Sequence, residues 1–320
     1  MIPVQPPDLS IVVLSFNRRD ALRRTLCELV KLQLGHVQII VVDNASGDSS
    51  AYMVSQEFPD LELLDLQTNI GVAGFNRGAE LAKAEFLLIL DDDSWPDERS
   101  LEIALEFLRA DESVGGIMLH RRHPVTLAPE WPFDNHNFRG IQRNWSDFGC
   151  GNLIRTALWR KVGGYEEAYF LYRNDTDLAL KVRAAGEDLA FCPDWWVWHD
   201  SVIAAHKSVR WLFLSTRNWI WMARRHAVGP SGFYGAMLGY LHAHRLADTR
   251  ILGHLAVLRA LFAGLLSPAP RLDLPVSGRA FNHLIALKRS LRNRDPSARP
   301  PSHVERPAPA NSSSMSRHSP

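Results

Sequence analysis

The chain has 320 residues, of which 46% are hydrophobic and 22% are charged, so it can bury a large core in one or two domains. Its formal net charge of +1 excludes a global attraction to nucleic acid. The cysteines Cys27, Cys150 and Cys192 form no C-x-x-C pair, which argues against a disulfide framework or a zinc knuckle and favours reduced thiols in the cytoplasm. The N-terminus lacks the basic and apolar regions of a secretory signal.

The N-terminal part of the chain alternates between predicted strands and predicted helices. Apolar runs at 10–16, 37–42, 61–66 and 86–90 predict strands, and the apolar residues of 21–33 recur at helical spacing. Most of these strands read as apolar runs rather than as alternations of apolar and polar residues. We therefore expect an α/β fold with a mostly parallel sheet that is covered by helices on both faces.

Polar residues follow each of these strands, and ligands of open α/β sheets bind beyond the carboxyl ends of the strands. The candidate ligand-binding residues there are Ser15, Asn17, Asp43, Asn44, Asn69, Gly71, Asn76, Asp91 and Asp92. Asp43 can accept a hydrogen bond from the N3–H of a pyrimidine base and Asn44 can complement a carbonyl, although an Asx turn is an equally good reading. The glycines of 69–78 could cradle a phosphate through backbone N–H groups.

Three acids, Asp91, Asp92 and Asp93, come directly after the fourth predicted strand. Adjacent carboxylates repel one another, so we expect a positive partner among them. Carboxylate oxygens suit Mn²⁺ or Mg²⁺. In an extended strand end Asp91 and Asp93 point to the same side and Asp92 points away. Both Asp91 and Asp93 are candidate metal ligands; Asp93 is the choice for direct metal contact, and Asp91 is better placed for a sugar hydroxyl of a nucleotide. The alternative is that the acids cap a helix that begins near Pro96.

The middle of the chain, 121–148, is rich in Pro, Asn, His and Trp and shows little periodicity. After it, a strand, a short helix and a longer helix beginning near Asp175 are predicted, and then a strand that ends at His199. Asp175 and Asp177 should point in different directions, one as a general base and the other as a cap or a contact that holds neighbouring backbone. The alternative is that both are simply acids favoured by the helix dipole at the N-terminus of the helix. His199 is a metal ligand, a phosphate contact or a packed core histidine.

The C-terminal third predicts further helices, beginning with 209–226, which contains the segment TRNWIWMARRH. The apolar stretch 251–266 is interrupted by His254 and Arg259 and is shorter than the ~20 residues of a membrane span. From 267 to 320 there are nine Lys or Arg and three Asp or Glu. The region 248–320 could therefore contact an anionic membrane, or its helices could pack on the catalytic domain or in a dimer interface.

Six segments occur in an order typical of one family: SIVVLSFNR, IIVVDNASGD, NIGVAGFNRG, LLILDDDSWP, GGYEEAYFLYRNDTDLALKVRAAG and VWHD. Together they resemble glycosyltransferase family 2, the inverting enzymes with the GT-A fold, and within it bacterial enzymes that add sugars, often rhamnose, to cell-surface polysaccharides. The resemblance covers about residues 8–225. It implies a GT-A catalytic domain over 1–225, with a donor-binding half at 8–120 and an acceptor half at 121–225. A helical extension at 226–294 and a disordered tail at 295–320 would follow.

The resemblance also implies roles for individual residues. Asp43 would read the base of a dTDP- or UDP-sugar, such as dTDP-rhamnose. The acid triplet, with His199 as a further ligand, would hold the metal and the ribose, and Asp175 would deprotonate the acceptor hydroxyl. The family usually has Glu-Asp where this chain has Asn174-Asp175, which removes one negative charge beside the base.

The expected partners are a nucleotide-sugar donor and a glycan or lipid-linked acceptor, and the expected location is the cytoplasm or the inner face of the plasma membrane. Trp145, Asn174 and Asp177 are the acceptor candidates. Trp131, Trp195 and Trp196, with Trp145, are candidates for stacking on sugar faces, although tryptophans in a strand more often belong to the core.

Two other classes of protein fit parts of the sequence. A sugar-nucleotide nucleotidyltransferase also uses carboxylates with Mg²⁺, but it would normally have a glycine-rich loop after the first strand, and SFNRRD has no glycine. A non-catalytic nucleotide-sugar-binding protein is favoured only by Asn174. The released product separates the two enzymes, because the nucleotidyltransferase releases pyrophosphate and the glycosyltransferase releases a nucleoside diphosphate.

Overall fold

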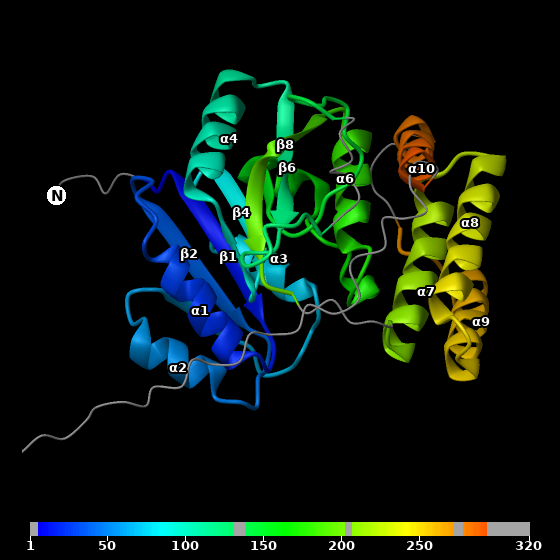
Figure 1. Ribbon diagram of the computed structural model, residues 1–320, viewed down its shortest axis with the longest axis horizontal. Coiled ribbons are helices and arrows are strands. Elements are labelled where there is room, and N and C mark those ends of the chain that lie inside the picture. Colours follow the sequence, from blue (N-terminus) through cyan, green and yellow to red (C-terminus); the bar gives the residue numbers. More distant parts are fainter. Residues whose placement is uncertain (1–5, 131–137, 202–206, 272–277, 293–320) are drawn as a thin grey trace, which may run out of the picture.

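The computed structural model of the protein describes residues 6–130, 138–201, 207–271 and 278–292 (Figure 1). The predictions for Trp131 and for the tail at 295–320 lie outside these residues. Within them, a central sheet is flanked by helices, and a group of C-terminal helices lies to one side of it.

One eight-stranded sheet, in the order β3-β2-β1-β4-β7-β6-β8-β5, runs through the described part of the chain. Its strands are β1 (Leu9–Ser15), β2 (Val37–Asp43), β3 (Glu62–Asp65), β4 (Phe86–Asp91), β5 (Ser94–Pro96), β6 (Val114–Arg122), β7 (Asn152–Arg155) and β8 (Asp188–His199). The first four strands are parallel, and β6 is parallel to β8. β7 runs antiparallel to both β4 and β6, and β5 runs antiparallel to β8. The expected α/β sheet is confirmed. It is parallel from β3 to β4 and contains antiparallel pairs from β4 to β5.

The sequence did not predict β5 or β6. β6 contains Gly115 and Gly116, which weaken a strand pattern because they offer no side chain to pack. The structure gives Gly116 a reason to be glycine. A Cβ atom there would lie 3.0 Å from the carbonyl oxygen of Leu153 on the neighbouring strand β7.

Helices cover both faces of the sheet. They are α1 (Arg19–Leu29), α2 (Ser50–Glu57), α3 (Ala73–Glu80), α4 (Glu98–Ala110), α5 (Thr156–Val162), α6 (Asn174–Ala184), α7 (Val209–His226), α8 (Pro230–Ala247), α9 (Ile251–Leu266) and α10 (Gly278–Arg292). Helices α1, α2 and α4 pack on the face that carries Ile11 and Val13, and α3, α5 and α6 on the face that carries Val12. Successive side chains of a strand point to opposite faces, so β1 supplies both cores.

The C-terminal helices form a separate layer. α7 packs against both α8 and α9, and α8 and α9 lie on the outside of the group (Figure 1). α10 contacts both α7 and α6, and in this way it joins this layer to a helix that packs on the sheet. Among the described residues, no helix combines the length and the apolar character that crossing a membrane requires. The predicted domain boundary at 225 stays a prediction, although α7 packs with the helices that follow it.

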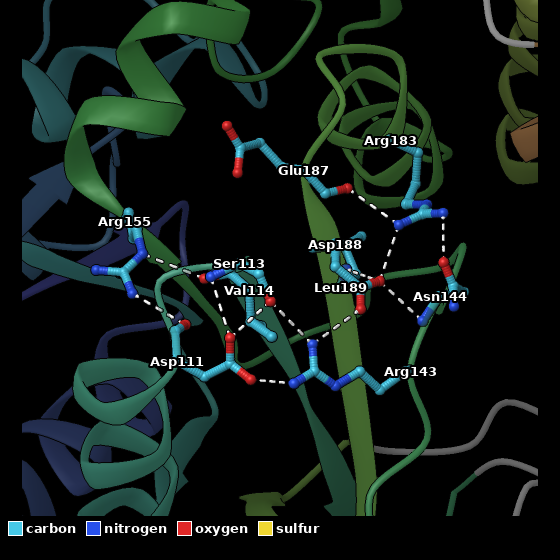
Figure 2. Close-up of polar contacts among 10 residues, drawn as sticks. All are labelled: Asp111, Ser113, Val114, Arg143, Asn144, Arg155, Arg183, Glu187, Asp188 and Leu189. Atoms are coloured by element: carbon cyan, nitrogen blue, oxygen red, sulfur yellow. Dashed lines mark hydrogen bonds and ion pairs between the residues drawn. The ribbon is translucent and has the colours of Figure 1, made fainter.

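The aperiodic segment before β7 is held at the start of β8, near Asp188 (Figure 2). Arg143 forms an ion pair with Asp111, and the backbone N–H of Asn144 donates to Asp188 Oδ1 at 2.8 Å. Arg183 of α6 donates both to Asp188 Oδ1 and to Asn144 Oδ1, each at 2.8 Å. These contacts anchor the segment that leads into β7, which carries part of the candidate active site.

Candidate active site

Arg18 is the positive partner of the acid triplet. Its Nη1 lies 2.9 Å from Asp92 Oδ1, and its Nη2 lies 2.8 Å from Asp93 Oδ2. Ser15 Oγ also donates to Asp92, at 3.0 Å. Because a guanidinium presents its donors in a fixed fork, it holds two neighbouring carboxylates in one geometry. The expectation that a positive group lies among the acids is confirmed.

The triplet is not the helix cap that the sequence left as an alternative. Asp97 caps α4, because its Oδ2 accepts a hydrogen bond from the backbone N–H of Ser100 at 3.0 Å. The acids at 91–93 are therefore not needed to satisfy the orphan N–H groups at the start of α4.

His199 is the second cation beside the triplet. Strands β5 and β8 pair with Ser94 opposite His199, and this pairing brings His199 Nε2 to 3.1 Å from Asp93 Oδ1. Its Nδ1 lies 2.6 Å from Glu130 Oε2. Burial alone would lower the pKa of His199, but the hydrogen bonds to Asp93 and Glu130 raise that pKa to about 10. Burial would likewise raise the pKa of Asp93, but the hydrogen bond and charge of His199, with Arg18, hold it at about 2.

Asp91 is the accessible acid of the triplet. Its side chain is 51% exposed, whereas that of Asp93 is 3% exposed. Protein atoms still surround it on several sides, and this burial raises the pKa of Asp91 to about 6. One ligand atom from each of Asp91, Cys150 and His199 lies within 4.8 Å of the other two.

The ligand atoms at this site fit a divalent cation. Asp91, Cys150 and His199 form the group, with Asp91 open to solvent and Asp93 beside His199. A carboxylate and an imidazole suit a hard or borderline divalent metal, and His199 Nε2 would have to release its proton for the metal to bind there. The sequence did not single out Cys150. Its Sγ donates to Ser94 Oγ at 2.9 Å, and burial raises the pKa of the thiol well above its usual value. Only the pairing of β7 with β4 brings this residue to the triplet.

Asp175 lies at the start of α6, where two neutral donors hold it. Asn152 Nδ2 donates to Asp175 Oδ1 at 3.0 Å, and the hydroxyl of Tyr165 donates to the same oxygen. Burial raises the pKa of Asp175, and the charge of Asp175 in turn raises the pKa of Asp91. The predicted base and the triplet are thus electrostatically coupled. Sequence reasoning missed both Asn152 and Tyr165.

Asp177 points away from Asp175, as predicted for acids at i and i+2. It is fully buried and accepts hydrogen bonds from Tyr169 Oη at 3.0 Å and His226 Nε2 at 2.9 Å, with Arg225 Nη1 at 3.3 Å. These groups hold the pKa of Asp177 below its usual value despite its burial. Asp177 therefore joins α6 to α7, and it has no surface to offer an acceptor, which corrects one of the predicted roles.

Trp145 requires the same correction. Its side chain is 2% exposed and stacks on Phe191 with the ring centroids 4.6 Å apart. Trp195 is also buried, and the guanidinium of Arg122 lies 3.8 Å from the ring centroid of Trp196. Trp145 and Trp195 therefore belong to the core, whereas Trp196 is half-buried and its role in stacking on a sugar stays a prediction. Asn174 is buried at the start of α6, and its role stays a prediction.

Asp43 keeps one oxygen for a ligand. Its Oδ1 accepts from the backbone N–H of Ser46 at 2.6 Å, as in the expected Asx turn. Its Oδ2 is buried and has no hydrogen-bond partner among the described residues. A buried acceptor without a partner costs free energy, so this oxygen is suited to receive a donor from a bound ligand.

The amides near Asp43 shape the loops instead. Asn44 accepts from the N–H of Ile70 at 2.9 Å and donates to the carbonyl of Gly71 at 3.0 Å. Asn69 Oδ1 accepts from the N–H of Gly71 at 2.9 Å. Asn17 Oδ1 likewise accepts from the N–H of Gly47 at 2.7 Å. Both side-chain groups of Asn44 therefore bond to the protein, and so do the amide oxygens of Asn69 and Asn17.

Asn76 of α3 connects the N-terminal part of the sheet to the segment that leads into Asp175. Its Oδ1 accepts from the N–H of Tyr165 at 2.8 Å, and its Nδ2 donates to the carbonyl of Tyr165 at 2.9 Å. Gly71 makes the second connection. Its φ is +62°, and a Cβ atom there would lie 2.0 Å from the carbonyl oxygen of Phe170. Only glycine fits so close to that carbonyl.

A parallel four-stranded half-sheet with Asp43 and an acid triplet at its carboxyl edge, and a further acid beside the triplet, is the arrangement of a GT-A nucleotide-sugar transferase. The sequence profile described as Glycosyl transferase family 2 matches residues 10–173. The chain belongs to glycosyltransferase family 2 and is a glycosyltransferase.

Individual proteins agree with this assignment. The chain is 22% identical over 264 residues to an N-acetylglucosaminyl-diphospho-decaprenol L-rhamnosyltransferase of Mycobacterium tuberculosis, covering 67% of this chain and 86% of that protein. It is 30% identical over 182 residues to an uncharacterized glycosyltransferase of Haemophilus influenzae, covering 54% of this chain and 61% of that one. The resemblance to rhamnosyltransferases of the family is thereby confirmed.

A solved structure shares the fold. It is a mannosyltransferase from Pyrobaculum calidifontis in complex with GDP-mannose and Mn²⁺, which superposes with a TM-score of 0.56 and 18% identity over 92% of this chain and 83% of that one. At this identity the likeness concerns the fold alone, and it confirms the GT-A architecture that the resemblance implied.

Proposed function

We propose that the protein transfers a sugar from a dTDP- or UDP-sugar, such as dTDP-rhamnose, to a hydroxyl of a glycan or lipid-linked acceptor in cell-surface polysaccharide synthesis. The observation that carries this proposal is the convergence of the buried Asp43 oxygen, the acid triplet and Asp175 at one edge of the sheet. The rhamnosyltransferase relative, which by its name acts on a decaprenol-linked sugar, supports the choice of donor and acceptor.

The donor would lie along the carboxyl ends of β1, β2 and β4. Asp43 Oδ2 accepts from the N3–H of the pyrimidine base, and Asp91, the exposed acid, accepts from the ribose or binds the metal. Asp93 and His199 Nε2 would complete a site for Mn²⁺ or Mg²⁺, since the metal would replace the proton that lies between them. A cation bound there would neutralise the negative charge that grows on the departing diphosphate.

Asp175 is the proposed base. Two neutral donors, Asn152 and Tyr165, hold its Oδ1, which leaves Oδ2 to accept the proton of the acceptor hydroxyl. The oxygen of that hydroxyl attacks C1 of the sugar from the face opposite the diphosphate. The bond from C1 to the diphosphate oxygen breaks as the new glycosidic bond forms, so a single displacement inverts C1.

The variant Asp175→Asn tests this role. It keeps the shape of the side chain and removes the base, so transfer should fall by about 10²–10⁴-fold while the affinity for the donor is retained. Transfer is measured as nucleoside diphosphate released in the presence of acceptor, and donor affinity is measured by calorimetry. Asp20→Asn, at an acid whose side chain is 79% exposed on α1, is the matched control. Near-normal turnover of Asp175→Asn would exclude Asp175 as the base.

We further propose that the outer face of α8 and α9 contacts an anionic membrane surface from the cytoplasmic side, beside a lipid-linked acceptor. The exposed apolar residues of this face are Phe233, Tyr234, Met237 and Leu241 on α8 and Ile251, Leu252, Leu255, Leu258, Phe262, Leu265 and Leu266 on α9. On these two helices the basic residues are Arg245 of α8 and Arg259 of α9, both exposed, and neither helix contains Asp or Glu. An exposed apolar face beside cations fits the boundary between lipid headgroups and acyl chains.

Sedimentation with vesicles tests this contact. The whole chain should sediment with vesicles that contain anionic lipid and remain in solution with neutral ones. The double variant Leu255→Asp, Phe262→Asp should lose the sedimentation, because it places two charges on the exposed stripe of α9. If the variant sediments like the original chain, this face is not the contact, and a change of mass in solution would identify it as a dimer interface instead.

A further inference from the structure

The loop that leads into Asp175 is held in an unfavourable backbone conformation. Phe170, Tyr172 and Arg173 all have positive φ, of +62°, +69° and +67°, and none of them is glycine. Arg173 is also the residue before the first turn of α6, and its side chain makes no capping hydrogen bond. Neither local propensity nor a local cap therefore fixes the start of α6. Such a conformation persists only when surrounding structure imposes it.

Asn218 of α7 supplies that constraint. Its side chain is fully buried, and its Nδ2 lies within hydrogen-bond distance of three carbonyl oxygens of the loop. These are Tyr169 O at 3.1 Å, Leu171 O at 2.9 Å and Tyr172 O at 2.9 Å. The two protons of one amide are shared among three acceptors, so a single side chain fixes the direction of three peptide groups of the loop.

Arg217 also holds this loop, and we call Arg217 and Asn218 together the clamp. Its Nε and Nη2 donate to Asn218 Oδ1 at 3.0 and 2.8 Å, which orients the amide so that Nδ2 faces the loop. Its Nη2 also donates to Ala168 O at 3.2 Å and to Tyr169 O at 3.1 Å. The guanidinium lies 4.3 Å from the ring centroid of Trp221, one turn further along α7. Two adjacent residues of one helix thus hold the loop from 168 to 172.

The clamped loop reaches the donor side as well. The carbonyl oxygen of Phe170 accepts a hydrogen bond from the backbone N–H of Val72 at 2.8 Å. The same oxygen is the atom that a Cβ on Gly71 would meet. The glycine loop over 69–72 therefore rests on a carbonyl that lies between the carbonyls of Tyr169 and Leu171, both of which Asn218 holds. A displacement of this loop would move the base and the donor-side loop together.

We propose that Asn218 is a positioning residue of the active site. By holding the carbonyls of the 169–172 loop, it fixes where α6 starts and therefore where Asp175 lies. It also fixes the position of the Gly71 loop, which bonds to Phe170 in the same segment. The segment TRNWIWMARRH, for which the catalytic groups give no reason, receives a role in this way. The proposal rests on the proposed function of Asp175 as the base.

The variant Asn218→Leu tests the proposal, because leucine has a similar shape and offers no donor. Thr216→Val is the matched control: Thr216 is also buried on α7, and its hydroxyl has no hydrogen-bond partner among the described residues. We expect Asn218→Leu to lower kcat by roughly tenfold to hundredfold, which is the effect of a small misplacement of a reacting group. Thr216→Val should leave kcat unchanged.

Hydrogen exchange gives a readout that does not depend on activity. Peptides that cover 69–73 and 168–176 should exchange faster in Asn218→Leu, with little change in the sheet and in α4. If both peptides and kcat match those of Thr216→Val, the proposal is wrong. A uniform rise of exchange over the whole chain also overturns it, because that result shows general destabilisation.

A second variant covers the case in which Asn218→Leu does not fold. Arg217→Lys keeps the positive charge and loses the fork that orients the amide, so it should show the same two changes to a smaller extent. Normal kcat and normal exchange in Arg217→Lys would contradict the clamp. Failure of the base assignment would be seen separately, as retained turnover in Asp175→Asn with the exchange result for Asn218→Leu unaltered.

Discussion

The substitution Asp177→Asn probes how the C-terminal helices are fastened to the catalytic domain. Asp177 belongs to α6, and its partners Arg225 and His226 belong to α7. The asparagine keeps the size of the side chain and removes the negative charge. Arg225 retains one acid, because Glu166 Oε2 lies 2.8 Å from its Nη1.

The expected cost follows from the burial of the group. Asp177 is fully buried, and removal of one member of a buried ion pair typically costs about 3–5 kcal/mol. Since Glu166 still neutralises Arg225 in part, we expect the lower end, about 3 kcal/mol in the free energy of unfolding. For a chain of this size that corresponds to a fall in Tm of roughly 6 °C.

Urea unfolding followed by circular dichroism measures the effect, with the exposed Asp20→Asn as the control that should change little. The pH dependence gives a second reading. The pKa of Asp177 is lower in the folded protein than in the unfolded chain, so its stabilisation is present above the unfolded pKa of about 3.9 and is lost as the pH falls through the folded value. The difference between the original chain and Asp177→Asn should therefore be full at neutral pH and shrink under acid.

Two results would refute this reasoning. Asp177→Asn could be as stable as the original chain at neutral pH, which would show that the buried charge makes no net contribution. Alternatively, the difference could stay constant down to acid pH, which would show that the effect comes from shape or packing rather than from the charge of Asp177.

Two further predictions concern the active site. Gly71→Ala should lower the free energy of unfolding by about 1–3 kcal/mol and weaken donor binding. Gly140→Ala is the control, because Gly140 has a similar φ of +64° but a Cβ added there would have nothing within 4 Å, so it should show the backbone strain alone. Equal effects of the two substitutions in thermal unfolding would rule out the clash with Phe170. Glu130→Gln should weaken Mn²⁺ binding by about 10–100-fold, because Glu130 orients His199; unchanged binding by electron paramagnetic resonance would contradict this.

The features that the sequence predicted well are those encoded by short stretches. The strands β1, β2 and β4 are mainly apolar runs, and Asp43 and the acid triplet come directly at the ends of β2 and β4. The divergence of Asp175 and Asp177 also follows from local geometry, since the two are two residues apart at a helix start.

The features that the sequence did not predict depend on which strands become neighbours. Charge repulsion showed that the acids need a positive partner, but only the fold shows that Arg18, 74 residues before Asp92, is that partner. Asn152 reaches Asp175 because β7 inserts between β4 and β6, and a strand of four residues leaves little pattern to read.

Burial also decided several roles that residue type alone left open. Trp145 and Asp177 have the chemistry for sugar or acceptor contacts, but one packs in the core and the other joins two helices. Asn44 and Asn69 have the groups to bind a nucleotide, yet their hydrogen bonds hold the Gly71 loop. Asp43 is the opposite case, because the structure leaves its Oδ2 without a partner among the described residues.

The most direct test of the account is the identity of the product released from a panel of nucleotide sugars, with and without acceptor, in Mn²⁺ and after treatment with EDTA. The account predicts that one dTDP- or UDP-sugar yields its nucleoside diphosphate with acceptor present, that EDTA stops the reaction, and that added Mn²⁺ restores it. Release of pyrophosphate, or full activity in excess EDTA, would contradict the central claim that the acids at the end of β4 hold a metal-bound sugar nucleotide.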